Sequence, residues 1–517
     1  MSPDRRRTIP TLDTPHIAVI GAGIGGLSAA LRLAYAGLRV SVFEAASGPG
    51  GKMRTRASVA GPVDAGPTVL TMKGVFDALF ADVGARLEDH VTLTAEPTLA
   101  RHFWRDGTVL DLMADADASV REVERVFGHT AAREFAAFSK RAQTLFDAFD
   151  APMMQAPAPS QAGLTAKVLR NPSLIPAMAP HQTLAQSLQK SFSEPKLAQL
   201  FARYATYVGG LPEEAPAILA LIWAAEQRGV WHVTGGMHAL ARAIAGLAAQ
   251  EGALFRYECG VTRIETGDKG PIAVHSPQGR VAVDAVLFNG DPRALTEGLL
   301  GPAVTQAVPA QATAPRSLSA HVYALAAKMT GPAPLAAHNV FFADDPAREY
   351  LPLRKGQDQT DPTLYVCAQD RFGGRTPDGA ERFEIIQNAP PLSPDTPPED
   401  PACPADILTR LSAFGLSFDP PPPPETLTSP AGFEALFPAS LGSLYGRSPA
   451  GMMAAFKRPT ARTKLRGLYL VGGGAHPGAG VPMATLSARH AAEAMLSDLA
   501  LTSPSRLRAM HGGTSTA

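Results

Sequence analysis

The chain has 517 residues, which is too long for one ordinary hydrophobic core and predicts about two or three domains, or one domain with large insertions. Hydrophobic residues make up 45% of the chain and charged residues 18%, a balance that favours a folded globular protein. Lysine plus arginine equals aspartate plus glutamate at 47 each, so the basic excess that nucleic-acid binding needs is absent. The three cysteines, Cys259, Cys367 and Cys403, lie far apart and predict neither a disulfide framework nor a metal site.

No targeting signal or membrane-spanning segment is predicted. Residues 1–15 contain three consecutive arginines and then stay polar, without the apolar stretch of a secretory signal, so they predict a disordered tail. The best apolar run, at 217–225, has about half of the roughly 18 residues that a transmembrane helix needs. A protein of this kind can still lie on a membrane surface.

A strand, a glycine turn, a helix and a second strand follow one another near the start of the chain. Residues 16–20 (HIAVI) and 39–43 (RVSVF) predict buried strands, and a helix to about Tyr35 lies between them. The turn contains Gly21, Gly23 and Gly26. The first glycine makes the turn, the second lets the backbone approach a pyrophosphate, and the third brings helix against strand. Glu44, at the end of the second strand, is placed to accept hydrogen bonds from a ribose, so the unit predicts a dinucleotide site without separating FAD from NAD.

The rest of the chain alternates between insertions and returns to an α/β pattern. Apolar residues at three- and four-residue steps predict helices in the first insertion, and a last strand, glycine turn and helix complete the nucleotide fold. The predicted parts are a disordered tail (1–15), the first part of the nucleotide-binding domain (16–70), a mainly helical segment facing substrate or membrane (71–228), the second part of the nucleotide-binding domain (229–300), a substrate-binding domain (301–458), the third part of the nucleotide-binding domain (459–502) and a second disordered tail (503–517).

Three motifs resemble one family of flavoproteins. GPGGKMRT (48–55) and DAGPTVL (64–70) resemble segments of the amine oxidase and carotenoid desaturase flavoproteins. LYLVGGGAHPGAGVPMATLSARHAAEAM (468–495) resembles the closing signature of bacterial phytoene-desaturase-type enzymes. The resemblance covers both ends and the middle α/β return. It implies FAD as cofactor and an α/β fold, with a Rossmann-like FAD-binding domain interrupted by substrate-binding segments.

The resemblance also implies which residues contact FAD. In the family, the second motif runs close to the flavin, and Gly51 would allow close approach while Lys52 and Arg54 supply charge to the diphosphate. The implied set is Gly21, Gly23, Ile24, Gly25, Gly26, Glu44, Ala45, Gly51, Lys52, Arg54, Pro67, Thr68, Val261, Gly473, Gly474, Gly480, Val481, Pro482 and Met483. Ala475 and Met483 depart from the threonine and the small residue that are usual there, which leaves the exact substrate open. His476 is either a structural residue of the turn or a base.

Within the family, the sequence most resembles the branch that desaturates acyclic 1-hydroxy- or 1-methoxy-neurosporene-type carotenoids. This resemblance lies in the segments 63–93, 100–112 and 338–346 and in the closing glycine turn. It implies hydride transfer to flavin that introduces the C3,4 double bond, and no catalytic acid or base is identified. The alternatives are a phytoene desaturase, a flavin amine oxidase, and a non-redox FAD-binding carotenoid isomerase or carrier. An amine oxidase often has a cysteine linked to FAD near the closing turn, yet no cysteine follows Cys403.

The partners implied are an acyclic carotenoid, membrane lipid, and oxygen or a quinone as electron acceptor. A forty-carbon chain needs a long apolar tunnel, and it can arrive only from lipid. Residues 164–180 combine apolar side chains with Lys167 and Arg170, a pattern that fits either a bilayer surface or a core-facing segment. We therefore expect a peripheral protein on the cytoplasmic side of the inner or photosynthetic membrane.

Overall fold

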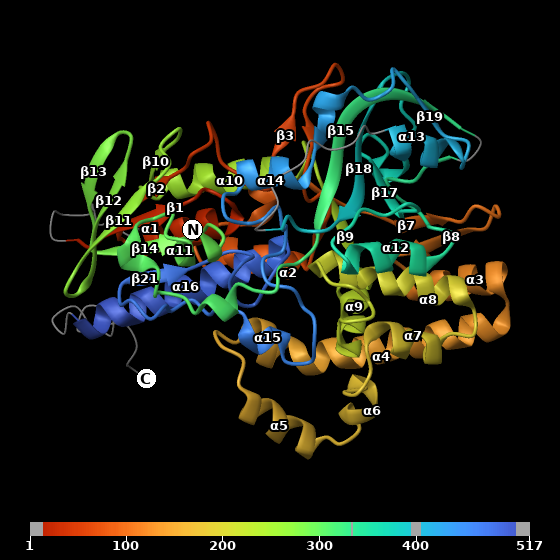
Figure 1. Cartoon of the computed structure of the whole chain (residues 1–517), viewed down its shortest axis with the longest axis horizontal. Coiled ribbons are helices and arrows are strands. Elements are labelled where there is room, and N and C mark those ends of the chain that lie inside the picture. Colours follow the sequence, from red (N-terminus) through yellow and green to blue (C-terminus); the bar gives the residue numbers. More distant parts are fainter. Residues whose placement is uncertain (1–13, 332–333, 394–404, 503–517) are drawn as a thin grey trace, which may run out of the picture.

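The computed structural model describes residues 14–331, 334–393 and 405–502 (Figure 1). Nearly all of the two predicted tails, and Cys403, lie outside the described residues. The described chain forms a smaller sheet with its helices on one side and a larger sheet above a group of helices on the other (Figure 1).

A five-stranded parallel sheet forms the centre of the first body, in the order β10-β2-β1-β14-β21. Its strands are β1 (His16–Ile20), β2 (Arg39–Phe43), β10 (Leu254–Arg256), β14 (Ala285–Phe288) and β21 (Leu468–Leu470). In β1, Val19 lies opposite Val42 of β2 on one side and Leu287 of β14 on the other. The prediction that both ends of the sequence build one nucleotide-type sheet is confirmed.

Helices cover one face of this sheet and a small antiparallel sheet lies against the other. The helices are α1 (Ile24–Tyr35), α10 (Met237–Gln250) and α16 (Val481–Thr502), and α1 packs against both of the others. The second face carries α11 (Arg293–Thr296) and the strands β11 (Arg263–Gly267), β12 (Gly270–Ser276) and β13 (Gly279–Ala282). The residues of α1 that face the sheet and its neighbours are small or apolar, and Ala29 and Ala30 are completely buried. Short side chains let the three helices approach closely.

The second body is built on an eight-stranded mixed sheet in the order β19-β15-β18-β17-β16-β7-β8, with β20 also paired to β15. Its strands are β7 (Thr98–Phe103), β8 (Val109–Met113), β15 (Ser319–Thr330), β16 (His338–Phe341), β17 (Leu364–Ala368), β18 (Glu381–Ala389), β19 (Ser417–Asp419) and β20 (Leu427–Thr428). The connecting helices are α12 (Pro346–Arg354), α13 (Ala405–Ser412) and α14 (Pro430–Leu436). Since β7 pairs with β16, the predicted segments 71–228 and 301–458 share one sheet.

The insertion is mainly helical, as its apolar pattern predicts. Its helices are α2 (Lys73–Ala81), α3 (Ala116–Phe127), α4 (His129–Phe149), α5 (Gln161–Arg170), α6 (Leu174–Met178), α7 (Leu184–Ser191), α8 (Pro195–Ala202) and α9 (Leu221–Gln227), and α15 (Ala454–Lys457) comes later in the chain. The aromatic side chains of Phe135, Phe138, Phe201 and Trp223 form its buried centre. In the described part of the chain, no helix has the length and apolar character needed to cross a membrane.

Short strands and a π-helix connect the insertion to the rest of the molecule. The short strands form two small sheets: β3 (Thr55–Arg56) with β4 (Val63–Asp64), and β5 (Leu70–Thr71) and β6 (Leu93–Ala95) with β9 (Val230–Val233). Strand β4 contacts β15 and β18 of the large sheet, whereas β5 and β9 contact α16 and α10 of the first body. A π-helix at Asp150–Gln155 continues α4, and the carbonyl oxygens of Met154 and Gln155 accept hydrogen bonds from His490 and Arg489 of α16. Helices α5 and α6 lie at the edge of the molecule (Figure 1), and no residue of α5 is buried, so α5 is not a core helix.

The glycine turns from the two ends of the chain meet around Asn289, the residue after β14. Its side-chain amide donates a hydrogen bond of 3.2 Å to the carbonyl oxygen of Gly21. A Cβ atom on Gly25 would lie 2.7 Å from Asn289 Oδ1 and 2.8 Å from the Cα of Gly472. A Cβ atom on Gly472 would lie 2.5 Å from the same oxygen. These distances leave no space for any side chain, so both positions require glycine.

Replacing Gly26 tests this close packing. A Cβ atom there would lie 2.1 Å from the carbonyl oxygen of Gly21, whereas a Cβ atom at Gly246 of α10 would meet nothing within 4 Å. We expect Gly26→Ala to lower the free energy of unfolding by roughly 2–4 kcal/mol, because backbone must shift to relieve the overlap. Gly246→Ala should raise it by up to about 1 kcal/mol, because alanine favours a helix. Thermal or urea denaturation checks both, and equal stability of the two variants would contradict the packing argument.

Candidate active site

A cavity of about 1490 Å³ is lined by residues of both bodies and of the helical insertion. Its wall includes the glycine turns from both ends of the chain, Ile386 of the large sheet and Phe146 of α4. Ligand pockets commonly measure roughly 300–1,000 Å³. This cavity therefore has the volume for more than one small molecule.

The structure brings nearly all of the predicted cofactor residues to this cavity. Its lining includes Gly21, Gly23, Ile24, Gly25, Glu44, Ala45, Gly51, Lys52, Pro67, Thr68, Val261, Gly473, Gly474, Gly480, Val481, Pro482 and Met483. Gly26 lies behind the lining, at the contact between helix and turn, which is the place that the motif predicts for it. Arg54 is not brought to the others: it donates a hydrogen bond of 2.7 Å to Thr428 Oγ1 and lies over the ring of Phe433.

Glu44 lies at the end of β2 with its carboxylate on the cavity wall. Its two oxygens accept hydrogen bonds from the backbone N–H groups of Ala22, at 2.6 Å, and Ala46, at 2.8 Å. These contacts fix the carboxylate beside the first glycine turn. Because each carboxylate oxygen can accept more than one hydrogen bond, both keep capacity for a hydroxyl donor such as a ribose.

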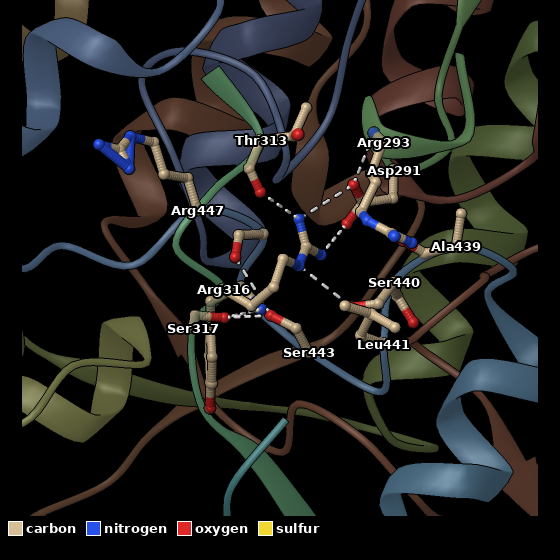
Figure 2. Close-up of polar contacts among 12 residues, drawn as sticks. Asp291, Arg293, Thr313, Arg316, Ser317, Ala439, Ser440, Leu441, Ser443 and Arg447 are labelled. Carbon is tan, nitrogen blue, oxygen red and sulfur yellow. Dashed lines mark hydrogen bonds and ion pairs between the residues drawn. The ribbon is translucent and has the colours of Figure 1, made fainter. Parts of the chain in front are cut away.

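A group of buried charges lies beside the glycine turns that contain Gly51 and Gly473. Figure 2 shows Arg316 paired with Asp291, while its guanidinium also donates to the carbonyl oxygens of Thr313, at 3.1 Å, and Ser440, at 3.2 Å. Arg458 donates to the carbonyl oxygen of Gly473 at 2.6 Å, which fixes the closing turn. Neither arginine belongs to a sequence motif, so no local pattern indicates that they lie at the site.

Positive charge exceeds negative charge in this group. Lys52, Arg316 and Arg458 surround the single carboxylate of Asp291, and Lys52 otherwise donates to the carbonyl oxygen of Leu444. Burial lowers the pKa of Lys52 to about 8 and that of Arg458 to about 10. Buried cations are stable only when anions compensate them. A diphosphate beside glycine turns that admit no Cβ atom fits both the charge and the space, so the residues present suit FAD.

A chain of hydrogen bonds links the segment 64–70 to the large sheet. Thr68 Oγ1 lies 2.9 Å from the hydroxyl oxygen of Tyr365, and that hydroxyl lies 2.8 Å from His338 Nδ1. Burial lowers the pKa of His338 to about 3, so its imidazole is neutral. Two carboxyl groups also line the cavity: burial raises the pKa of Glu226 to about 7 and that of Glu384 well above its usual range. Thr68 is predicted from its motif, whereas sequence reasoning missed Tyr365, His338, Glu226 and Glu384, because only the folded chain brings them together.

The residues of the closing turn hold the helical insertion against the cofactor turns. His476 lines the cavity, and its Nε2 atom bonds to the carbonyl oxygen of Ala156 at 2.9 Å. Burial lowers its pKa, so this imidazole is neutral at pH 7 and donates from Nε2. Ala475 is completely buried and Met483 lines the cavity. The geometry gives His476 a defined structural contact, while its use as a base stays a hypothesis.

Comparison with known proteins agrees with this site. The family described as "Flavin containing amine oxidoreductase" matches residues 24–386. Hydroxyneurosporene desaturase from Cereibacter sphaeroides is 53% identical over 94% of this chain and 98% of its own length, and the protein of that name from Rhodobacter capsulatus is 47% identical over 93% and 98%. Putrescine oxidase bound to putrescine has the same fold, with a TM-score of 0.60 over 94% of this chain and 99% of that one at 14% identity.

The fold, the cavity and these relatives define an FAD-dependent oxidoreductase. The chain belongs to the flavin-containing amine oxidoreductase family, among its carotenoid desaturases. The predicted family, the α/β fold with a Rossmann-like FAD-binding domain, and FAD as cofactor are thereby confirmed. The assignment of single residues to FAD stays a prediction.

Lys52 allows that assignment to be tested. Its ammonium loses charge as the pH rises through about 8, and a bound diphosphate will raise this pKa because opposite charges favour each other. FAD affinity should therefore fall above pH 8, by at most about tenfold per pH unit. At pH 7, Lys52→Met should bind FAD roughly 10- to 100-fold more weakly and lose this pH dependence.

Titration of the apoprotein with FAD across this pH range provides the measurement. Arg54→Met is the matched control, since the Arg54 side chain lies outside the cavity and its loss should leave FAD affinity unchanged. If the Lys52 variant keeps the affinity and pH dependence of the wild type, Lys52 is not a cofactor ligand.

Proposed function

We propose that the protein introduces the C3,4 double bond into acyclic carotenoids of the 1-hydroxy- or 1-methoxy-neurosporene type. The observation that carries this proposal is a single cavity in which glycine turns of the FAD type continue into an apolar wall. Three relatives with the name hydroxyneurosporene desaturase, at 53%, 47% and 42% identity, support the same substrate class.

The wall away from the glycine turns suits a long hydrocarbon. It is formed largely by the helical insertion and includes Phe146, Phe149, Met153, Leu164, Val168 and Ile222. Burial of apolar surface is favourable by roughly 25 cal/mol per Å², so a carotenoid gains much by entering. Methionine side chains adapt to an irregular ligand, which fits a methyl-branched chain.

The proposed chemistry asks little of the side chains beyond position. Bound FAD supplies the hydride acceptor. The positive charge that develops on the carotenoid is spread by its polyene, so no strong base is required, and the released proton can pass to water. The protein's part is to hold C3 and C4 in the reactive position and to keep the reacting carbons away from bulk water. The neutral imidazoles of His338 and His476 add no competing positive charge there.

Helices α5 and α6 form the proposed contact with membrane lipid. Leu169 and Ile175 are 71% and 44% exposed, and both line the cavity. Lys167 and Arg170 lie on the same helix as Leu169 and can meet acidic headgroups. This segment would place the cavity mouth in the lipid from which both a carotenoid and a quinone are drawn. Oxygen is the other proposed electron acceptor.

Anaerobic mixing of the holoprotein with 1-hydroxyneurosporene tests the reaction. We expect the flavin absorbance to bleach while the polyene spectrum shifts to the red, because conjugation is extended as the flavin takes two electrons. Addition of a quinone or of oxygen should then restore the flavin absorbance. A changed carotenoid spectrum without flavin bleaching indicates an isomerase, and no change in either spectrum indicates a carrier. Turnover of phytoene or of an amine in place of this carotenoid would favour the corresponding enzyme.

Flotation with vesicles of phosphatidylcholine and phosphatidylglycerol tests the membrane contact. The double variant Leu169→Ser with Ile175→Ser should bind roughly tenfold or more weakly, since each apolar side chain contributes about 1.5–3 kcal/mol on burial. Val59→Ser is the matched control, because Val59 is 91% exposed and lies outside the cavity lining. Equal flotation of wild type and double variant would reject α5 and α6 as the membrane contact.

A further inference from the structure

One cation of the cavity wall has no role in the site described above. Arg203 follows α8, lies deep in the protein and faces the cavity. Its guanidinium donates to the hydroxyl oxygen of Tyr207 at 3.0 Å and lies 5.1 Å and 5.4 Å from the ring centres of Tyr207 and Tyr365. Among the described residues, no carboxylate forms an ion pair with it. One neutral hydroxyl therefore serves a group with five N–H donors.

The carboxyl groups near Arg203 do not satisfy its N–H donors, because none of them, among the described residues, accepts a hydrogen bond from its guanidinium. Glu226 also faces the cavity, but burial raises its pKa to about 7, so it carries only part of a negative charge. Glu349 is completely buried, has its pKa raised to about 7 and accepts a hydrogen bond from Thr363. A hydrocarbon that fills the cavity would take water from the Arg203 guanidinium without replacing its hydrogen bonds.

The position of Arg203 relates it to one end of the ligand. Tyr365, on which its guanidinium lies, has its hydroxyl 2.9 Å from Thr68 Oγ1. Thr68 belongs to the segment that is expected to run close to the flavin. Arg203 therefore lies on the part of the cavity wall that is expected to face the flavin. In the proposed substrates the oxygen-bearing carbon C1 is separated from C3 by a single methylene group, so the oxygen must also lie near the flavin.

Resting on the proposed function, we propose that Arg203 selects the substrate by donating a hydrogen bond to the oxygen on C1. A hydroxyl and a methoxyl group both offer lone pairs, so a donor recognises either of them, whereas an ionised carboxylate would recognise the hydroxyl alone. A carotenoid end without oxygen leaves the cation unsatisfied. Arg203 thus favours oxygenated over hydrocarbon substrates and sets which end of the molecule reaches the flavin.

Binding of three carotenoids to the holoprotein tests this role. Dissociation constants for 1-hydroxyneurosporene, its 1-methoxy derivative and neurosporene are measured by quenching of protein fluorescence in detergent. In the wild type we expect both oxygenated carotenoids to bind more tightly than neurosporene. Arg203→Met keeps most of the stem and removes the donors, so the preference for each oxygenated carotenoid should fall roughly 10- to 100-fold. Arg203→Lys, which keeps a charged donor, should retain an intermediate preference.

Arg141→Met is the matched control. Arg141 donates to the carbonyl oxygen of Ala177 and to Ser187 Oγ at 2.7 Å each and lies outside the cavity lining, so its loss should leave the preference unchanged. Bound flavin and the unfolding temperature show whether each variant is folded. If Arg203→Met does not fold, Arg203→Lys decides, since an unaltered preference there contradicts the guanidinium as the selecting donor.

The outcomes separate the inference from the function. An unchanged preference in folded Arg203→Met, or loss of preference for the 1-hydroxy but not the 1-methoxy carotenoid, overturns the role of Arg203 and leaves the desaturase function standing. If the wild-type holoprotein binds these carotenoids but desaturates none of them, the proposed function is wrong, whatever the variants show.

Discussion

The two ends of the sequence build one site because their backbone turns pack closely around the Asn289 side chain. The strands β1 and β21 belong to opposite ends of the sequence and do not pair with each other; β14 lies between them and ends at Asn289. Only glycine at 25 and 472 lets both turns reach this side chain. Because all five strands are parallel, their carboxyl ends open at one edge, and the cavity forms there. Without this contact the cofactor turns would not face each other.

Unpaired positive charge gives the cavity two distinct ends. At the closing turn, the two cations Lys52 and Arg458 lie near one carboxylate, that of Asp291. An anionic cofactor would neutralise the remaining positive charge. Near Thr68 and Tyr365, Arg203 lies among neutral hydroxyls and carboxyl groups that burial leaves only partly ionised. The apolar wall of the helical insertion continues from there to α5. The same physical rule, that a buried cation needs a partner, thus points to a diphosphate at one end and to a weaker oxygen acceptor at the other.

Local signals explain what the sequence could predict. The strands at 16–20 and 39–43 and the glycines between them follow patterns that need no distant partner, and the fold and cofactor followed from them with the family motifs. Arg203, Arg316 and Arg458 carried no such signal, because an arginine that tertiary packing buries looks in the sequence like a surface residue. Arg54 shows the reverse: it lies in a cofactor motif, yet its side chain bonds to Thr428. The sharing of one sheet by β7 and β16 depends on long-range pairing, which no local pattern specifies.

The position of β21 at the edge of the five-stranded sheet, paired with β14, also fixes when the protein can acquire its cofactor. During translation, β1, β2 and β14 leave the ribosome long before the segment 468–483 is made, so a nascent chain holds only one side of the nucleotide cradle and exposes the unpaired edge of β14. Loading with FAD must therefore follow synthesis of almost the whole chain. Until then, the unpaired edge of β14 is open to pairing with strands of other chains.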